Sequence, residues 1–124
     1  MNIVNAKKTV YSRLSTISSI TVDSETLDIV VSQRYEPQNV DFAKKIYIAF
    51  GITNYIPGYS LEKDIEVEDI EFTIHIFAKN SKFTTLTLEE IKGKLILDDL
   101  RLIVGRDVPE PSEGVSHLVS IFKF

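Results

Sequence analysis

The chain of 124 residues contains no cysteine and no tryptophan, and only five glycines, four prolines and one methionine. Without cysteine there is no disulfide framework, no thiolate metal site and no cysteine nucleophile, and nothing in the sequence points to an oxidising compartment. The five glycines are isolated, and neither of the phosphate-binding motifs G-x-x-x-x-G-K and G-x-G-x-x-G occurs. We therefore expect no cofactor.

Basic residues and long hydrophobic runs are also scarce. Fourteen lysines and arginines against 18 aspartates and glutamates give a net charge of −4, which argues against a surface that binds duplex DNA. The longest uncharged run, residues 46–61, is shorter than the roughly 18 residues that a membrane-spanning helix needs. Residues 9–22 contain Arg13 and several serines where a signal peptide would be apolar. We expect no transmembrane segment, no signal peptide and a place in the cytoplasm.

The composition and length are those of one folded domain. Hydrophobic residues make up 44% of the chain and charged residues 26%. At this length roughly two thirds of the surface of the unfolded chain can be buried, which is enough for one core and not for two. We expect a single domain over residues 1–124.

The hydrophobic spacing predicts a helix followed by strands. Apolar residues three and four positions apart predict an amphipathic helix over residues 3–17, fraying before Asp23. A β-branched run predicts a strand over residues 27–35, which Pro37 ends. Alternation over residues 46–52 predicts a second strand, and residues 53–60 have the composition of a turn.

A third, long strand is expected from about Ile65 to Lys79, with a change of parity inside it. Its apolar residues stand at odd positions up to Val67 and at even positions after that. A slip of one residue turns every side chain to the other face, so this change predicts either a bulge or two shorter strands. We expect the irregularity at Glu68 and Asp69.

The last third of the chain is expected to hold a helix and a terminal strand. Thr87 and Glu90 match a capping box, which predicts a helix that begins near Thr87. Residues 95–104 are too apolar for one helical stripe. Either the helix ends near Asp98 and a short strand follows, which we favour, or a longer helix is buried on two sides. After a loop at residues 105–114, residues 115–124 predict the last strand.

This order of elements predicts the fold class. Consecutive strands joined by turns favour antiparallel pairing. We expect an α+β fold, mainly an antiparallel sheet with two helices packed on one face.

Patterns that carry catalysis or bind metals are missing. His75 and His117 fall in expected strands and have no ligand partner at helical spacing. The two rings could meet across adjacent strands, but two imidazoles make at most half a zinc site. The serines are scattered, and none occupies a G-x-S-x-G turn. We expect no catalytic, cofactor-binding or metal-binding residue, and therefore no enzyme.

The most distinctive local feature is a cluster of acidic residues relieved only by Lys63: Glu62, Asp64, Glu66, Glu68, Asp69 and Glu71. One interpretation is a solvated hairpin edge whose charges discourage pairing between edges. The functional interpretation is a negative wall that repels passing nucleic acid, or a weak site for divalent cations. Alternate residues from Glu62 to Glu68 share one face of an extended chain, which fits a wall better than an ion cage.

Three stretches hold a surplus of apolar residues: residues 46–52, residues 95–104 and the last strand. Two helices on one sheet do not obviously cover this much apolar surface. Such a surplus is typical of a subunit interface. The alternative is the well-filled core of a monomer.

Four segments form a layout that covers nearly the whole chain. They are YSRL at 11–14 in the first helix, YIAFG at 47–51 after a proline, FTIHIFAK at 72–79, and LVSIFKF at 118–124 after the second helix. This layout resembles the tail terminator, or tail completion, family of long-tailed bacteriophages. It departs from the family at Phe77, where tryptophan is frequent, and in a longer loop at residues 105–114.

The resemblance implies a structural virion protein that forms a ring, typically a hexamer, on the head-proximal end of the tail tube. Such a ring stops tube polymerisation and joins the tail to the neck or head. The implied partners are further copies of the chain, the tail tube protein and a neck or head-completion protein, in a particle assembled in the host cytoplasm without a membrane.

In such a ring DNA would pass through the lumen without specific binding, and the acidic segment would face the lumen. The alternatives are another neck or head-completion ring protein or, in a different class, a small cytoplasmic ligand-binding domain or enzyme. A closed pocket that holds His75 or His117 beside carboxylates would mark this last class.

Overall fold

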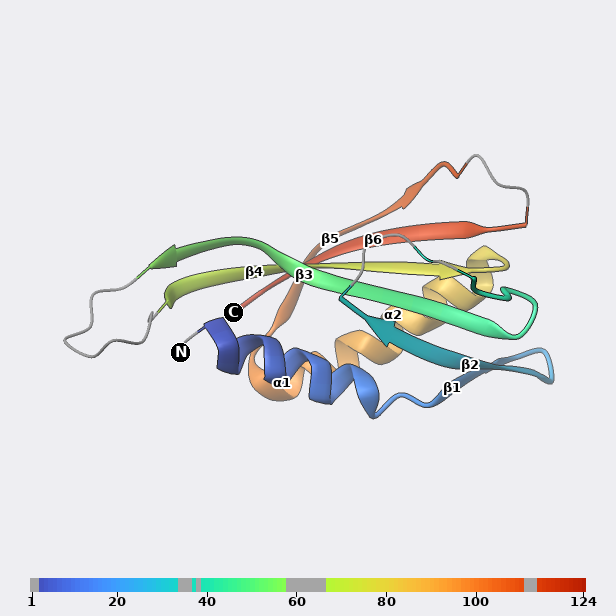
Figure 1. Cartoon of the computed structure of the whole chain (residues 1–124), viewed down its shortest axis with the longest axis horizontal. Coiled ribbons are helices and arrows are strands. Elements are labelled where there is room, and N and C mark those ends of the chain that lie inside the picture. Colours follow the sequence, from blue (N-terminus) through green and yellow to red (C-terminus); the bar gives the residue numbers. More distant parts are fainter. Residues whose placement is uncertain (1–2, 34–36, 38, 58–66, 111–113) are drawn as a thin grey trace.

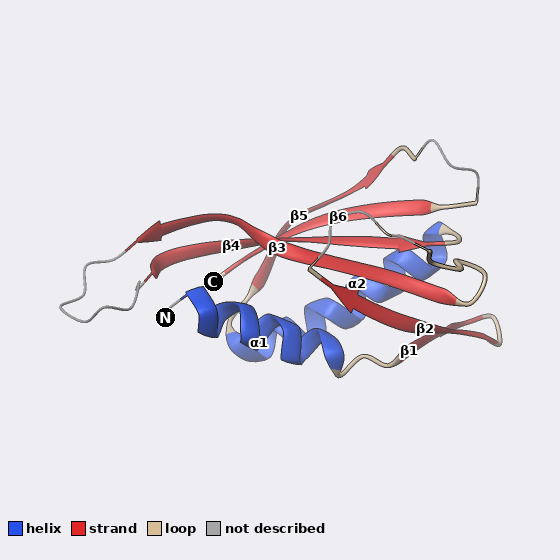
Figure 2. Ribbon diagram, viewed as in Figure 1, coloured by secondary structure: helices blue, strands red, loops and turns tan. Residues whose placement is uncertain are grey.

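The computed structural model describes residues 3–33, 37, 39–57, 67–110 and 114–124. Its elements follow in the order α1 (Ile3–Ser15), β1 (Ser19–Val22), β2 (Glu25–Ser32), β3 (Lys45–Pro57), β4 (Val67–Ala78), α2 (Ser81–Leu95), η1 (Ile96–Asp98, a 3-10 turn), β5 (Arg101–Val108) and β6 (Ser116–Lys123). Figures 1 and 2 show the two helices on the same side of a twisted sheet. The expected α+β fold, a mainly antiparallel sheet with two helices, is confirmed.

The six strands form one sheet in the order β1-β2-β3-β4-β6-β5. Neighbouring strands are antiparallel except β2 and β3, which are parallel, so the expectation of antiparallel pairing is wrong at this one junction. A parallel pair cannot be joined by a tight hairpin. Of the described residues between β2 and β3, Val40 and Phe42 pack on the face opposite the helices, against Tyr47, Ala49 and Phe77.

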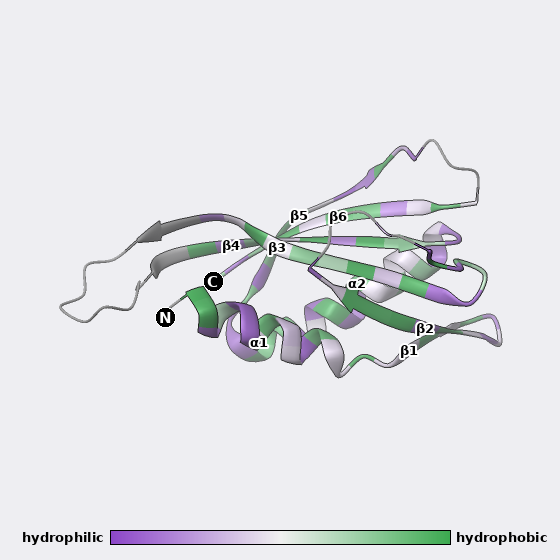
Figure 3. Cartoon of the chain, in the orientation of Figure 1, coloured by the Kyte–Doolittle hydropathy of each residue, from purple (hydrophilic) through white to green (hydrophobic). Residues whose placement is uncertain are grey.

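The main core lies between the sheet and the helices. Alternate residues of β3 and β4 point into it, as the period of a strand requires, and Figure 3 shows apolar residues recurring along both strands. Its largest fully buried side chains are Phe72, Phe83, Phe122, Leu14, Leu27, Ile46, Ile48, Ile74, Ile76, Ile91, Leu95 and Leu100. Each such side chain stabilises the fold by roughly 1.5–3 kcal/mol relative to an exposed one. This layer therefore dominates the stability of the domain.

The bulge predicted in β4 is confirmed. Ile56 pairs with Asp69 and Pro57 pairs with Val67, so Glu68 is the extra residue on β4. This is the position at which the parity of the apolar residues changes. β3 consequently extends through Pro57 and includes residues 53–57, which the sequence assigned to a turn.

The second helix begins at Ser81, so the start predicted near Thr87 is wrong. Asn80 is the residue that caps it, because its side-chain oxygen accepts a hydrogen bond from the backbone N–H of Phe83 at 3.1 Å. Thr87 is buried inside the helix, where its hydroxyl donates to the carbonyl of Phe83 at 2.6 Å. Two cap-like signals compete in the sequence, and the earlier one is used.

Two further boundaries differ from the sequence predictions. α1 ends at Ser15, and the stretch expected to be its frayed end contains the strand β1, whose Ile20 enters the core. After α2 the favoured alternative is confirmed, since the helix gives way to η1 and then to a strand. β5 runs on to Val108, beyond the expected end at residue 104, because it pairs with β6 along this length.

Candidate functional site

The acidic residues singled out in the sequence are only partly within the described ranges. Glu62, Asp64 and Glu66 lie outside them. Glu68 and Asp69 stand near the start of β4, at the bulge. Glu71 is half-buried and opposite Lys123 of β6, on the face away from the helices. Neither a wall that faces a lumen nor a cation site is tested by these positions, and both stay predictions.

His75 and His117 meet across β4 and β6 on the face opposite the helices. Nδ1 of His75 lies 2.9 Å from Nε2 of His117, and Nδ1 of His117 lies 2.7 Å from a carboxylate oxygen of Glu110. The ring of Phe77 stacks on that of His117 with 4.0 Å between centroids. The three polar residues therefore form one hydrogen-bonded chain, in which His117 is 3% exposed.

The carboxylate sets the direction of these hydrogen bonds when both rings are neutral. A carboxylate only accepts, so Nδ1 of His117 donates to Glu110 and Nε2 of His117 accepts from Nδ1 of His75. Nε2 of His75 then carries no hydrogen. Burial, and secondly the neighbouring His117, lower the pKa of His75 to about 4, which keeps this ring neutral at pH 7.

The chain of hydrogen bonds ties the connection after β5 to the centre of the sheet. Sequence reasoning anticipated that the two histidines could meet, and the structure confirms it. It missed Glu110, which stands seven residues before His117 across a connection that contains proline. No spacing rule links a carboxylate in such a connection to a histidine in the following strand.

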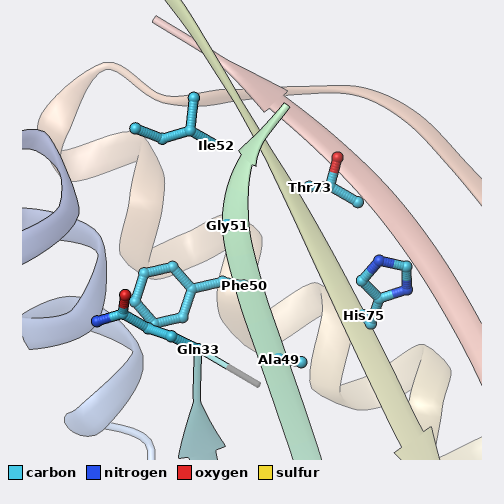
Figure 4. A pocket seen from close by; sticks show the side chains of 7 residues that line it. All are labelled: Gln33, Ala49, Phe50, Gly51, Ile52, Thr73 and His75. Carbon is cyan, nitrogen blue, oxygen red and sulfur yellow. The ribbon is translucent and has the colours of Figure 1, made fainter. Parts of the chain in front are cut away.

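The hollow that borders His75 is small. Its volume is about 140 Å³, and it is lined by Gln33, Ala49, Phe50, Gly51, Ile52, Thr73 and His75. Figure 4 shows Phe50 and Ile52 pointing to one side of β3, and Thr73 and His75 lying on the other. The hollow is a notch beside β3, past the point where β2 stops pairing at Ala49.

This notch differs from a small-molecule site in size and in chemistry. Ligand pockets typically measure about 300–1,000 Å³ and converge several polar groups on the ligand. None of the residues that line the notch is a carboxylate. The notch is thus not a closed pocket that holds a histidine beside carboxylates.

Two other kinds of site are absent from the described residues. No group of three or more His, Asp or Glu side chains there is arranged to hold a metal ion. No described helix combines the length and the apolar character needed to cross a membrane.

Of the three apolar stretches, residues 95–104 keep the most exposed apolar surface. Residues 46–50 are buried throughout, and Leu118 and Phe122 of β6 enter the core. Around η1 and β5, by contrast, four large apolar side chains remain exposed: Ile96 (46%), Leu97 (63%), Ile103 (51%) and Val104 (45%). We call these four residues the edge surface. Ile96 and Leu97 belong to the turn after α2, whereas Val104 is opposite Ile121, on the face of the sheet away from the helices.

β5 is an outermost strand and pairs with β6 alone. Leu102 pairs with Phe122 and Val104 with Ile121, so Ile103 is an extra residue at a bulge. Bulges and charged side chains at an edge hinder the addition of another strand. The edge surface therefore offers apolar side chains for contact more readily than it offers a free hydrogen-bonding ladder.

The edge surface is held by anchored residues. Leu95 and Leu100 flank η1 and are buried, and the N–H of Leu100 donates to the carbonyl of Leu95 at 3.1 Å. Between them Asp99 closes the turn with a φ of 62°. The guanidinium of Arg13 on α1 pairs with Asp98 at 2.6 Å and fixes η1 to the first helix. Ile96 and Leu97 are thus exposed on a turn that is itself firmly packed.

A second exposed apolar surface lies at the other end of the strand order. Val22 of β1 and Thr85 and Leu86 of α2 line a hollow of about 390 Å³, with Lys82 and Glu89 among its other lining residues. Leu86 is 39% exposed. We call Val22, Thr85 and Leu86 the α2–β1 groove.

Comparison of the sequence with protein-family models and with curated proteins finds no match. The fold and these surfaces therefore define the class of protein. They describe an α+β domain with one main core and with exposed apolar side chains at both ends of its sheet. Its described hollows include a polar one of about 310 Å³ beside Asp23, Glu25 and Lys82.

Proposed function

We propose that the protein is a structural subunit of a bacteriophage tail, of the tail terminator type, which forms a ring on the head-proximal end of the tail tube. The edge surface is the observation that carries this proposal. Its four apolar side chains stay exposed although the core is complete without them. Large apolar side chains that stay exposed in a group at one edge of a sheet are typical of protein-interaction sites. The order of sequence segments along the chain resembles that of the tail terminator family, and this resemblance suggests that the assembly is a ring.

The mechanism is contact, not catalysis. One face of the ring covers the last ring of the tube and removes the position at which another tube subunit would add, while the other face joins the neck or head. Each apolar side chain that is fully buried contributes roughly 1.5–3 kcal/mol. The four side chains of the edge surface are already about half buried, so covering them adds roughly half of that value each, on the order of 5 kcal/mol in total. This gain offsets part of the entropy lost on association.

In this proposal the acidic residues line the lumen of the ring. Negative charge on a lumen repels the phosphates of transiting DNA and keeps them from binding. We expect a variant with Glu62, Asp64, Glu66 and Glu68 replaced by glutamine or asparagine to assemble normally but to release DNA more slowly. Unchanged DNA ejection by phage carrying this variant would remove the lumen assignment.

Another neck or head-completion ring protein is the nearest alternative, and position in the particle separates the two. A small enzyme or ligand-binding domain is the alternative from a different class. The Glu110–His117–His75 chain favours it, because such a chain can transfer protons. The volume and lining of the notch beside His75 count against it.

Native mass spectrometry of the purified protein, with and without tail-tube subunits, tests the proposal. We expect a closed oligomer, or tubes of reduced length with the protein bound at one end. Tubes that grow to the same length with no bound protein, together with a chain that stays monomeric in both samples, would contradict it.

A further inference from the structure

We propose that His75 and His117 bind a divalent transition-metal ion of the kind that imidazole prefers, with Zn²⁺ as its representative. The ion lies between Nδ1 of His75 and Nε2 of His117, two atoms that are 2.9 Å apart in the metal-free chain. Water completes the coordination shell, since the described residues form no group of three or more ligands. The site is independent of the proposed function, because one chain supplies both histidines.

The two ring nitrogens are placed to share one ion. They already share a single hydrogen, so both point into the space between the rings. Two nitrogens bound to one tetrahedral Zn²⁺, each at about 2.0–2.1 Å, lie about 3.4 Å apart. The pair therefore has to open by roughly 0.5 Å to admit the ion.

Glu110 gives His117 the surroundings of a metal ligand. A histidine that binds a metal through one nitrogen almost always donates its other ring N–H to a carboxylate, a carbonyl or water, which orients the ring and makes the ligand nitrogen more basic. Nδ1 of His117 donates to Glu110 at 2.7 Å, and Nε2, on the other side of the ring, points at His75. The negative charge of Glu110 also stabilises a cation bound beyond the ring.

The two histidines differ in how firmly they are held. His117 is 3% exposed, and the ring of Phe77 stacks on it with 4.0 Å between centroids. A ligand that is already fixed loses little side-chain freedom on binding. His75 is half-buried, so its ring can make the small opening movement and an ion can approach the pair from solvent.

Binding requires His75 to change its tautomer. In the metal-free chain with neutral rings, Nδ1 of His75 carries the hydrogen that His117 accepts. The metal takes a lone pair, so this hydrogen leaves Nδ1 as a proton while Nε2 of the same ring takes up a proton from water. Both rings stay neutral, which is the form that binds metals, and no net proton is released.

The chemistry of the pair distinguishes it from a site for hard cations. Mg²⁺ and Ca²⁺ prefer oxygen ligands, whereas imidazole suits Zn²⁺, Cu²⁺ and Ni²⁺. The chain contains no cysteine, and His75 and His117 are its two histidines. Binding of Zn²⁺ through imidazole can therefore occur at this pair alone.

Isothermal titration calorimetry tests the site, using the chain without an affinity tag, Zn²⁺ as the probe and excess Mg²⁺ to occupy carboxylates. We expect a single Zn²⁺ per chain. His75→Asn removes one of the two imidazoles and should abolish this binding. Glu110→Gln still accepts a hydrogen bond from His117 but has no charge, and should weaken binding at least about tenfold.

Glu90→Gln is the matched control for Glu110→Gln. It makes the same change of charge on α2, which covers the other face of the sheet, and should bind Zn²⁺ as tightly as the wild-type chain. Far-UV circular dichroism checks that each variant is folded. A Glu110→Gln variant with wild-type affinity would overturn the part assigned to Glu110.

Nuclear magnetic resonance provides a second measurement that needs no variant. Zn²⁺ should shift the ring resonances of both histidines in the wild-type chain, and Mg²⁺ should leave them unchanged. Absence of Zn²⁺ binding to the wild-type chain, ring resonances that Zn²⁺ does not move, or binding that survives His75→Asn would overturn the site. The pair would then serve only to tie Glu110 to the sheet.

Discussion

Two apolar stretches of the chain differ in their exposure to solvent. Residues 46–50 of β3 are buried at every position, whereas residues 95–104 leave Ile96, Leu97, Ile103 and Val104 exposed. β3 lies between β2 and β4, with helices over one face and Val40 and Phe42 over the other. β5 has one neighbouring strand. Position in the sheet, and not hydrophobicity, decides which stretch serves folding and which is available for contact.

The largest expected effect comes from the buried stretch. Ile48→Ala removes a fully buried side chain from the centre of the core and should lower the free energy of unfolding by about 2–5 kcal/mol. Urea denaturation followed by circular dichroism measures it. A loss below about 1 kcal/mol would show that β3 is less tightly packed than its burial indicates.

The stability of the fold should depend on pH through His75, which lies on the sheet face opposite the helices. Its pKa is lowered in the folded chain to about 4, so the unfolded chain binds this proton first as the pH falls below about 6.5. The stability that depends on a neutral His75 is complete above pH 6.5 and is lost as the pH falls toward 4. After allowance for solvent screening at a half-buried ring, we expect a loss of about 1 kcal/mol between pH 7 and 5.

His75→Asn is the matched variant for this pH dependence, because an amide N–H can replace the Nδ1–H that bonds His117 but does not titrate. Urea midpoints of both proteins at pH 7, 6 and 5 give the comparison. We expect a flatter dependence for the variant. Parallel curves for the two proteins would show that the His75 ring is not held neutral by the fold.

Asn80 caps α2, the helix that leads into η1 and its exposed apolar residues. Asn80→Ala removes the acceptor for the N–H of Phe83 and should cost about 1 kcal/mol of stability. Asn80→Asp keeps an acceptor and should stay within about 0.5 kcal/mol of the wild type. Equal losses in the two variants would mean that the cap does not determine where α2 begins.

The smallest effect on stability is expected at the edge surface. Ile103→Ala and Leu97→Ala remove side chains that are half or more exposed, and each should change the free energy of unfolding by less than about 0.5 kcal/mol. The same variants should weaken self-association, which sedimentation velocity measures. A loss of stability as large as that of Ile48→Ala would erase the distinction between the two stretches.

Local patterns predicted much of this fold. The parity change located the bulge at Glu68, because strand periodicity is a property of adjacent residues. The start of α2 was wrong because Asn80 and Thr87 offer similar local signals, and tertiary packing buries Thr87. The strand β1 was missed because four residues rich in serine and threonine gain their stability from pairing with β2.

The functional features were harder to predict because they depend on distant residues. The partner of His117 is Glu110, which only the path of the chain after β5 brings into contact. The exposure of Leu97 depends on where η1 and β5 fall relative to α1 and β6, and the composition of residues 95–104 contains no trace of it. The sequence indicated a surplus of apolar residues, and the structure shows where it lies.

Tube length, measured by negative-stain electron microscopy, tests the central claim most directly. Tail-tube subunits are polymerised alone, with the wild-type chain and with Leu97→Asp, whose exposed position leaves the core intact. We expect shorter tubes with density at one end for the wild-type chain, and tubes as long as the untreated ones for the variant. Tubes of equal length in all three samples would contradict it.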